Sequence, residues 1–135
     1  MTRYARMWPR EVFDCDDGTL EKLDLLKEKG VYVLYRDDVP YYVGRATKDL
    51  RLRLSYHAKK PGSKYYNFWN FFSVFVPGKK ASSGELEAIR ELEAILISAM
   101  PTANGAKPKL EKKNFPKEVK DLMRRIRMNR IPPSP

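Results

Sequence analysis

The stretch GVYVLYRDDVPYYVG, from Gly30 to Gly44, constrains the fold more than any other part of the chain. Two runs rich in β-branched and aromatic residues flank the turn-forming segment RDDVP. Pro40 is compatible with the start of a strand, where a missing N–H is tolerated. The pattern therefore predicts a β-hairpin, and four of its fifteen residues are tyrosines. Those tyrosines either pack within the strand pair or face a reaction site.

The segments around the hairpin show helical and extended patterns in turn. The clearest helix begins after Ser82 or Ser83 as N-cap. Its apolar face consists of Leu86, Ile89, Leu92, Leu96 and Met100. In chain order, we expect a short helix over 18–30, strands over 31–35 and 41–45, a helix over 47–57, a strand over 65–76, and helices over 83–100 and 117–127.

This order predicts an α+β fold. A small, three-stranded, mostly antiparallel sheet, in β-β-α-β-α order, is expected to be flanked by helices. The 135 residues suit one core. We expect an N-terminal arm and short helix over 1–29, with residues 1–17 irregular, a core over 30–104, and a basic C-terminal extension with a short helix over 105–135.

Composition excludes several classes of protein. The single cysteine, Cys15, rules out an internal disulfide framework and a multi-cysteine metal site. The longest apolar run, AILISAM, is far shorter than the roughly 20 residues that cross a bilayer. No apolar segment follows the basic N-terminus, so a secretory signal is not expected. These features predict a cytoplasmic protein without membrane contact.

The net charge of +10 is concentrated at one end of the chain. Residues 105–135 hold ten basic and three acidic side chains, which gives this segment a charge of +7. Such a segment suits a polyanion, either nucleic acid or an acidic membrane surface, or it is a solvated tail. We favour DNA, with phosphates bound without sequence reading. The candidate phosphate-binding residues there are Lys107, Lys109, Lys112, Lys113, Arg124 and Arg125.

Four polar residues stand out by position. Arg53 and His57 lie four residues apart and share a helix face, although ordinary solvated charges would also fit. Glu93 falls within the apolar stripe of its helix, where a carboxylate needs a salt bridge or a bound cation. Asn104 precedes a glycine and, alone, fits an ordinary turn.

Together these residues resemble the GIY-YIG nuclease family. Its two motifs are matched by Gly30-Val31-Tyr32 and Tyr42-Val43-Gly44, with valine in place of each central isoleucine. The resemblance spans about Gly30 to Asn104, and it includes the arginine-bearing helix and the segment PTAN. Members often place the glutamate about twelve residues before the asparagine. Here Glu93 precedes Asn104 by eleven and Glu91 by thirteen, and we prefer Glu93 because it lies within the stripe.

The resemblance implies a metal-dependent DNA endonuclease with a single-metal site. Glu93 would hold one Mg²⁺ or Mn²⁺, and Arg53 would neutralise the phosphate. Tyr32 would orient or deprotonate the attacking water, with Arg45 or the metal favouring its phenolate. Tyr42, His57 and Asn104 would position phosphate or water, and Arg45 would also contact the substrate. The pathway, whether repair or restriction, is left open.

The hairpin register provides a structural test of this site. We expect Tyr32 directly opposite Tyr42, which requires an odd loop, such as Arg36-Asp37-Asp38, with a bulge. A tight two-residue turn without one would pair Val33 with Tyr42 and separate the two tyrosines.

Two other functions remain open: a DNA-binding module of this fold with little or no catalysis, and an adaptor for a membrane surface or acidic partner. For the nuclease, substrate specificity would come from a protein partner or from self-association, or it would be low. In the aromatic segment most rings are expected in the core, with Tyr65 or Trp69 available to stack on an exposed base.

Overall fold

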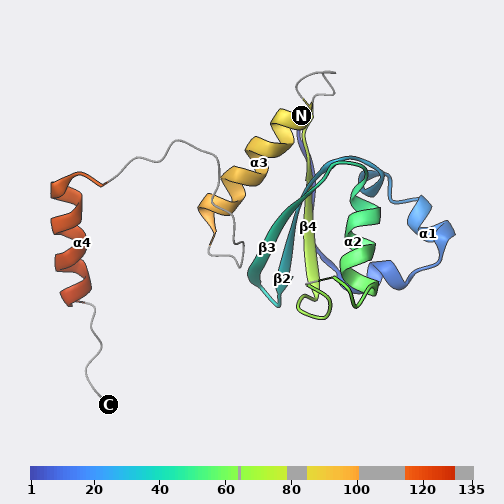
Figure 1. Cartoon of the computed structure of the whole chain (residues 1–135), viewed down its shortest axis with the longest axis horizontal. Helices are drawn as coiled ribbons and strands as arrows, with labels where there is room; N and C mark the ends of the chain where they lie inside the picture. The colour runs from blue at the N-terminus through green and yellow to red at the C-terminus, as the bar shows by residue number, and fades with distance from the viewer. Residues whose placement is uncertain (64, 79–84, 101–114, 130–135) are drawn as a thin grey trace, which may run out of the picture.

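A four-stranded antiparallel sheet forms the centre of the protein (Figure 1). The structure, a computed structural model, describes residues 1–63, 65–78, 85–100 and 115–129. The strands are β1 (Arg3–Pro9), β2 (Gly30–Arg36), β3 (Val39–Ala46) and β4 (Phe71–Val76), and their spatial order is β1-β4-β2-β3. The α+β class is confirmed, but the sheet has four strands rather than the three expected, because β1 was not predicted. Strands β1 and β3 are the two edges of the sheet.

Helices cover both faces of the sheet. The 3-10 helix η1 (Arg10–Asp14), α1 (Asp17–Glu21), η2 (Asp24–Lys27) and α2 (Leu50–Lys59) lie on one face, and α3 (Glu85–Ala99) lies on the other (Figure 1). A further helix, α4 (Lys117–Asn129), follows a segment outside the described residues. No helix in the described ranges is both long and apolar enough to span a bilayer.

Strand β2 is buried on both sides because it lies between β4 and β3 and is covered by both helical layers. Its even-numbered residues, Tyr32 and Leu34, belong to the core beneath α2. Its odd-numbered residues, Val31 and Val33, pack with Ile89 of α3. The alternation of a strand therefore divides the hairpin residues between two cores.

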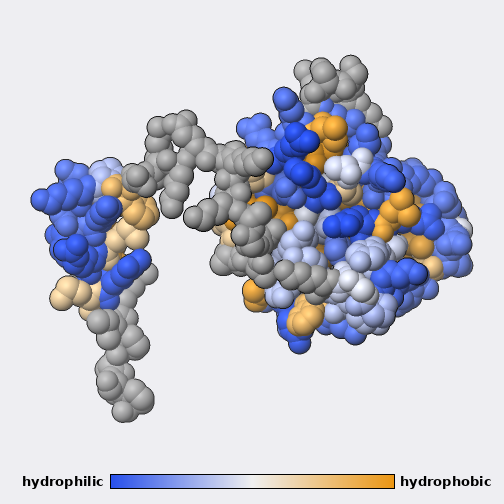
Figure 2. Space-filling model, in the orientation of Figure 1, coloured by the Kyte–Doolittle hydropathy of each residue, from blue (hydrophilic) through white to orange (hydrophobic). Residues whose placement is uncertain are grey.

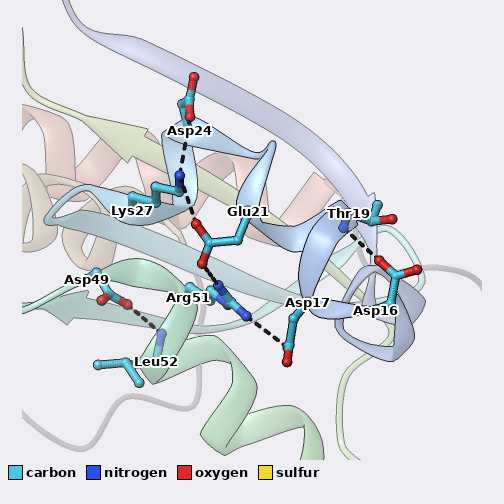
Figure 3. Close-up of polar contacts among 9 residues, drawn as sticks. All are labelled: Asp16, Asp17, Thr19, Glu21, Asp24, Lys27, Asp49, Arg51 and Leu52. Atoms are coloured by element: carbon cyan, nitrogen blue, oxygen red, sulfur yellow. Dashed lines mark hydrogen bonds and ion pairs between the residues drawn. The ribbon is translucent and has the colours of Figure 1, made fainter.

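The N-terminal end of α2 is fixed by polar contacts (Figure 3). Asp49 caps the helix and accepts a hydrogen bond from the Leu52 N–H at 2.7 Å. Arg51 contacts Asp17 at 3.2 Å and Glu21 at 2.9 Å, which ties α2 to α1. These contacts set the position of the helix that carries Arg53 and His57.

Several expected elements differ in the structure. Residues expected to form an irregular arm include β1, an edge strand in which only Ala5 is buried, so its sequence shows no alternation. The helix expected over 18–30 is divided at Leu23, whose ψ of 76° is not helical. The strand expected over 65–76 begins only at Phe71. Leu86, placed on the buried stripe of α3, is 44% exposed.

The turn before β4 is held by Arg10. Its guanidinium donates to the Ala58 carbonyl at 2.6 Å and to Oδ1 of Asn67 at 3.1 Å, and it lies over the rings of Tyr66 and Trp69. Asn67 has a φ of 66°, a left-handed conformation that asparagine tolerates better than most residues. A turn therefore replaces the first half of the expected strand.

The hairpin register differs from the predicted one, but Tyr32 and Tyr42 still lie on the same face of the sheet. The turn is the two-residue Asp37-Asp38, and Tyr42 pairs with Leu34 while Tyr32 pairs with Gly44, so the two tyrosines are not directly opposite. A bulge at Tyr41 shifts the register, so that the pairing of Val33 with Tyr42 expected for a tight turn does not occur. Tyr32 and Tyr42 therefore share one face as diagonal neighbours, with ring centroids 6.1 Å apart.

Candidate active site

An open pocket of about 580 Å³ lies beside the outer edge of β3. Tyr42 and Arg45 of β3, Arg53 of α2 and Glu93 of α3 line it. Tyr42 belongs to the α2 face of the sheet and Arg45 lies at an odd position, on the α3 face. Because β3 has no strand beyond it, side chains from both faces meet past its edge. Four residues predicted from sequence are thereby brought together.

Tyr32 and His57 lie behind this pocket and are almost fully buried. The Tyr32 hydroxyl is 2.9 Å from Nε2 of His57, and Nδ1 of His57 is 2.7 Å from Oγ of Ser63. Ser63 is itself buried and also accepts a hydrogen bond from the Tyr65 N–H at 3.3 Å. These contacts leave both imidazole nitrogens with a partner.

Gly44, the glycine of the Tyr42-Val43-Gly44 motif, makes room for Tyr32 of the Gly30-Val31-Tyr32 motif. Gly44 is the cross-strand partner of Tyr32, and a Cβ atom at position 44 would overlap the Tyr32 hydroxyl and ring. It would also approach the ring of Tyr42 to 2.8 Å. Only glycine permits this approach of the tyrosine ring to the backbone.

Burial and neighbouring charge shift the protonation of the buried pair. Burial, and then Tyr42, raise the pKa of Tyr32, while a hydrogen bond with Arg53 acts in the opposite direction. The cation that favours the Tyr32 phenolate is thus Arg53 rather than Arg45. Burial, reinforced by Arg53, lowers the pKa of His57 to about 4, so the imidazole is neutral at neutral pH.

Arg53 connects the buried pair with the open pocket. Its hydrogen bond with Tyr32 raises the pKa of the guanidinium, which stays charged. The guanidinium also lies 5.9 Å from the ring centroid of Tyr56. None of the described carboxylates forms an ion pair with Arg53, in contrast to Arg51 on the same helix. Its positive charge is therefore available to an anion in the pocket.

Two carboxylates line the pocket, Asp49, which caps α2, and Glu93. Glu93 is the one predicted from the sequence. Burial raises its pKa and Arg45 partly opposes this, at a distance of 3.6 Å between Nη1 and Oε1. Glu91 is exposed, which agrees with the preference for Glu93. Within the described residues no three His, Cys, Asp or Glu side chains gather as a metal site. One carboxylate still fits Mg²⁺, which commonly keeps several waters and uses one or two carboxylates with substrate phosphates.

Several residues of the site were not found from the sequence. Thr47, Lys48, Asp49 and Tyr56 are among those that line the pocket, and Ser63 contacts His57. Lys48 follows β3, and nothing in its local pattern separates it from other surface lysines. Ser63 sits in a loop six residues after His57, and only the folded loop reveals the contact.

Other predicted residues lie elsewhere. Asn104, Lys107, Lys109, Lys112 and Lys113 are outside the described residues. Arg124 and Arg125 lie on α4 and are exposed. Figure 2 shows hydrophilic residues over one side of α4 and apolar residues over another. Trp69 is only 2% exposed and so cannot stack on a base.

A comparison with family models decides the relationship. The model for the GIY-YIG catalytic domain matches residues 28–105. The chain belongs to the GIY-YIG family. The match includes both tyrosine motifs, α2 and α3, so it covers every described element that lines the pocket. Searches of curated proteins and of solved structures returned no match. GIY-YIG family members are endonucleases, which supports a nuclease-type function for this chain.

Proposed function

We propose that the protein is a metal-dependent DNA endonuclease that hydrolyses phosphodiester bonds at the pocket beside β3. The observation that carries this proposal is the position of Arg53, which lines the pocket and interacts electrostatically with the buried Tyr32. Among the described residues, no carboxylate forms an ion pair with this guanidinium, and the same site holds a carboxylate and a tyrosine–histidine pair. Such groups would supply what phosphodiester hydrolysis requires: charge neutralisation, a metal ligand and a proton acceptor.

Arg53 would bind the phosphate through its planar guanidinium. In the free protein Tyr32 is fully buried, and Arg53 interacts with its hydroxyl. A bound phosphate would draw Arg53 away and open the hydroxyl to the attacking water. Because burial disfavours the phenolate, Tyr32 would pass its own proton to Nε2 of neutral His57 as it accepts one from the water.

Glu93 and the water molecules around it would hold one Mg²⁺ or Mn²⁺. When bound, such an ion supplies Lewis-acid stabilisation of the leaving oxygen. The raised pKa of Glu93 favours a nearby cation, because a positive charge offsets the cost of burying the carboxylate. Arg45 would contact the substrate at the same rim, and Tyr42 would position the phosphate.

The basic residues of α4 would contact DNA phosphates outside the pocket, without reading sequence. Lys107, Lys109, Lys112 and Lys113 would extend this contact, and Asn104 would help to position the phosphate. Specificity would come from a protein partner or from self-association. A cytoplasmic location is part of the same proposal.

A second function is a DNA-binding module with little or no catalysis. The raised pKa and complete burial of Tyr32 favour it, because both hinder deprotonation of water in the free protein. The charged residues of the pocket are nonetheless in place, so we rank the endonuclease first.

Plasmid nicking distinguishes the two functions. Wild-type protein is expected to nick supercoiled DNA with Mg²⁺ or Mn²⁺ and to stop when EDTA is added. Arg53→Ala should lower the rate by about 10²- to 10³-fold, the usual loss when one transition-state donor is removed. Lys59→Ala is the matched control, since it removes an exposed positive charge from the same helix without touching the contacts that hold α2 in place. DNA binding without nicking under either metal would favour the module.

A further inference from the structure

A ladder of aromatic rings leads from the pocket to the protein surface. Tyr42, which lines the pocket, stacks on Tyr65 with ring centroids 4.0 Å apart. Tyr65 meets Tyr41 edge to face at 6.1 Å, and Tyr41 stacks on Phe68 at 6.0 Å with an interplanar angle of 4°. Phe68 is 49% exposed and forms the outer end. The ladder therefore joins the proposed cleavage site to an exposed aromatic ring.

The bulge in β3 creates this ladder. In a regular strand Tyr41 and Tyr42 would point to opposite faces of the sheet. Tyr41 is the extra residue of the bulge, between Pro40 paired with Tyr35 and Tyr42 paired with Leu34. Both tyrosine rings contact Tyr65, so the bulge has turned two neighbouring side chains toward one side.

The segment that carries Phe68 is held in place. The Phe68 N–H donates to the Tyr65 carbonyl at 3.1 Å, and Arg10 holds the side chain of Asn67. Asn70 accepts a hydrogen bond from the Asp37 N–H at 2.7 Å and donates to the Asp37 carboxylate at 2.9 Å. These bonds join the turn before β4 to the hairpin turn. Phe68 is thus presented in a preorganised position, which limits the entropy lost on binding.

We propose that Phe68 and Tyr41 form a stacking platform for an unpaired base of the DNA substrate. A single exposed aromatic residue is ordinary on a protein surface. Here the ring is preorganised, and it continues without interruption to the site where phosphate would bind. Stacking on aromatic side chains is the usual way in which proteins hold unpaired bases.

This inference rests on the proposed function and specifies its substrate class. Bases within a duplex already stack on their neighbours, so they present no free face to Phe68. The preferred substrate is therefore DNA with an unpaired segment next to the cleaved bond, such as a flap or a splayed end. A fully paired duplex would contact the pocket and the basic residues alone.

Binding measurements test the platform separately from cleavage. The probes are a flapped duplex with 2-aminopurine in its unpaired segment and a fully paired duplex with 2-aminopurine inside it, both in EDTA. Wild-type protein is expected to quench 2-aminopurine in the flap. Phe68→Ala should abolish the quenching and weaken flap binding by roughly 5- to 150-fold, with duplex binding unchanged.

Three variants control for loss of apolar surface and for folding. Phe68→Trp retains a ring and should keep flap binding, whereas Phe68→Leu retains apolar bulk and should lose the quenching. Tyr4→Ala removes an exposed ring that stacks on Phe75 at the opposite edge of the sheet, and it should change neither signal. Circular dichroism verifies that each variant is folded.

The outcomes separate the two proposals. Equal losses on both DNAs in Phe68→Ala, unchanged quenching, or an equal effect of Tyr4→Ala would overturn the platform. If Phe68 and Tyr41 bound only peptides or other proteins, wild-type protein would give no quenching. That result would also overturn the proposal that they stack on an unpaired base. Quenching that depends on Phe68, without nicking under any metal, would retain the platform and reject the endonuclease.

Discussion

Each edge strand of the sheet carries an arginine that pairs with a glutamate from another segment, and the two pairs differ. On β1, Arg3 contacts Glu28 at 2.9 Å; on β3, Arg45 approaches Glu93 only to 3.6 Å. The exposures of the two glutamate side chains are nearly equal, 19% and 21%. Only Glu93 lines a pocket that also contains a guanidinium without a carboxylate partner among the described residues. An arginine–glutamate pair at an edge is thus not a site by itself, and its surroundings decide its role.

Replacing the two glutamates tests this comparison most strongly. Glu93→Gln should reduce metal-dependent nicking by roughly 10³-fold, because Lewis-acid stabilisation is worth several kcal/mol. It should also abolish Mn²⁺ binding measured by electron paramagnetic resonance in the absence of DNA. Glu28→Gln should leave both unchanged and affect only thermal stability. If the two variants lost nicking equally, the contrast between the edges would be wrong.

A methyl group at position 44 tests the close packing of Tyr32 against the backbone of β3; no described glycine holds a tyrosine ring in this way at the β1 edge. Gly44→Ala should lower the free energy of unfolding by about 3 kcal/mol, since overpacking a dense core typically costs 1–3 kcal/mol and Tyr32 has little room to move. Urea denaturation measures the change. Gly18→Ala is the matched control, because a Cβ there meets only Oδ1 of Asp16 at 3.5 Å. Wild-type stability in Gly44→Ala would show that Tyr32 is not fixed by this approach.

The pH dependence of stability tests the neutral histidine behind β3. The pKa of His57 is about 4 in the folded protein and about 6.5 in an unfolded chain. Between these values the unfolded state binds the extra proton, so stability is complete above pH 6.5 and decreases as the pH falls toward 4. The advantage of wild type over His57→Asn should shrink by on the order of 3 kcal/mol between pH 7 and 4.

The measured quantity is the difference in the free energy of unfolding between wild type and His57→Asn. The raised pKa of Glu93 changes stability with pH in the opposite direction, but it does so in both proteins and cancels in the difference. A constant difference across this range would mean that His57 is not held neutral.

The smallest expected effect concerns α4, which belongs to neither edge. Arg124→Ala combined with Arg125→Ala should reduce the slope of log K for DNA against log salt by about 1.8, since each phosphate contact contributes about 0.9. Fluorescence anisotropy at several salt concentrations measures the slope, and the metal requirement for nicking should persist. Arg3→Ala on the β1 edge is the control. An unchanged slope would assign all phosphate contacts to other residues.

Residue periodicity was sufficient to predict the hairpin, α2, α3 and α4. It placed Glu93 correctly on a helix face directed at the sheet, because an apolar stripe interrupted by a carboxylate is visible in sequence. Periodicity could not find β1, whose one buried residue gives no pattern. The turn at 65–69 was also missed, because its aromatic composition is that of a strand and a contact from distant Arg10 holds it.

The site itself was predictable only in part. The motifs indicated Tyr32, Tyr42 and Arg53, but not that Ser63 contacts His57 or that Arg53 engages Tyr32. Such contacts join segments that meet only after folding. The exact register of β2 and β3 could not be predicted from the sequence either, since a two-residue turn with a bulge and a three-residue turn both place Tyr32 and Tyr42 on one face.

The bulge at Tyr41 is also an extra residue that the strand pairing does not need. Tyr35 pairs with Pro40 and Leu34 with Tyr42, so a chain without Tyr41 would keep both pairs in a regular hairpin. Gly44 would still lie opposite Tyr32, and Val43 would stay in the core that it shares with Ile89. The deletion would remove the ring that contacts Tyr65 and Phe68. In a mutant library, loss of this codon should therefore preserve the fold and break the aromatic connection between the pocket and Phe68.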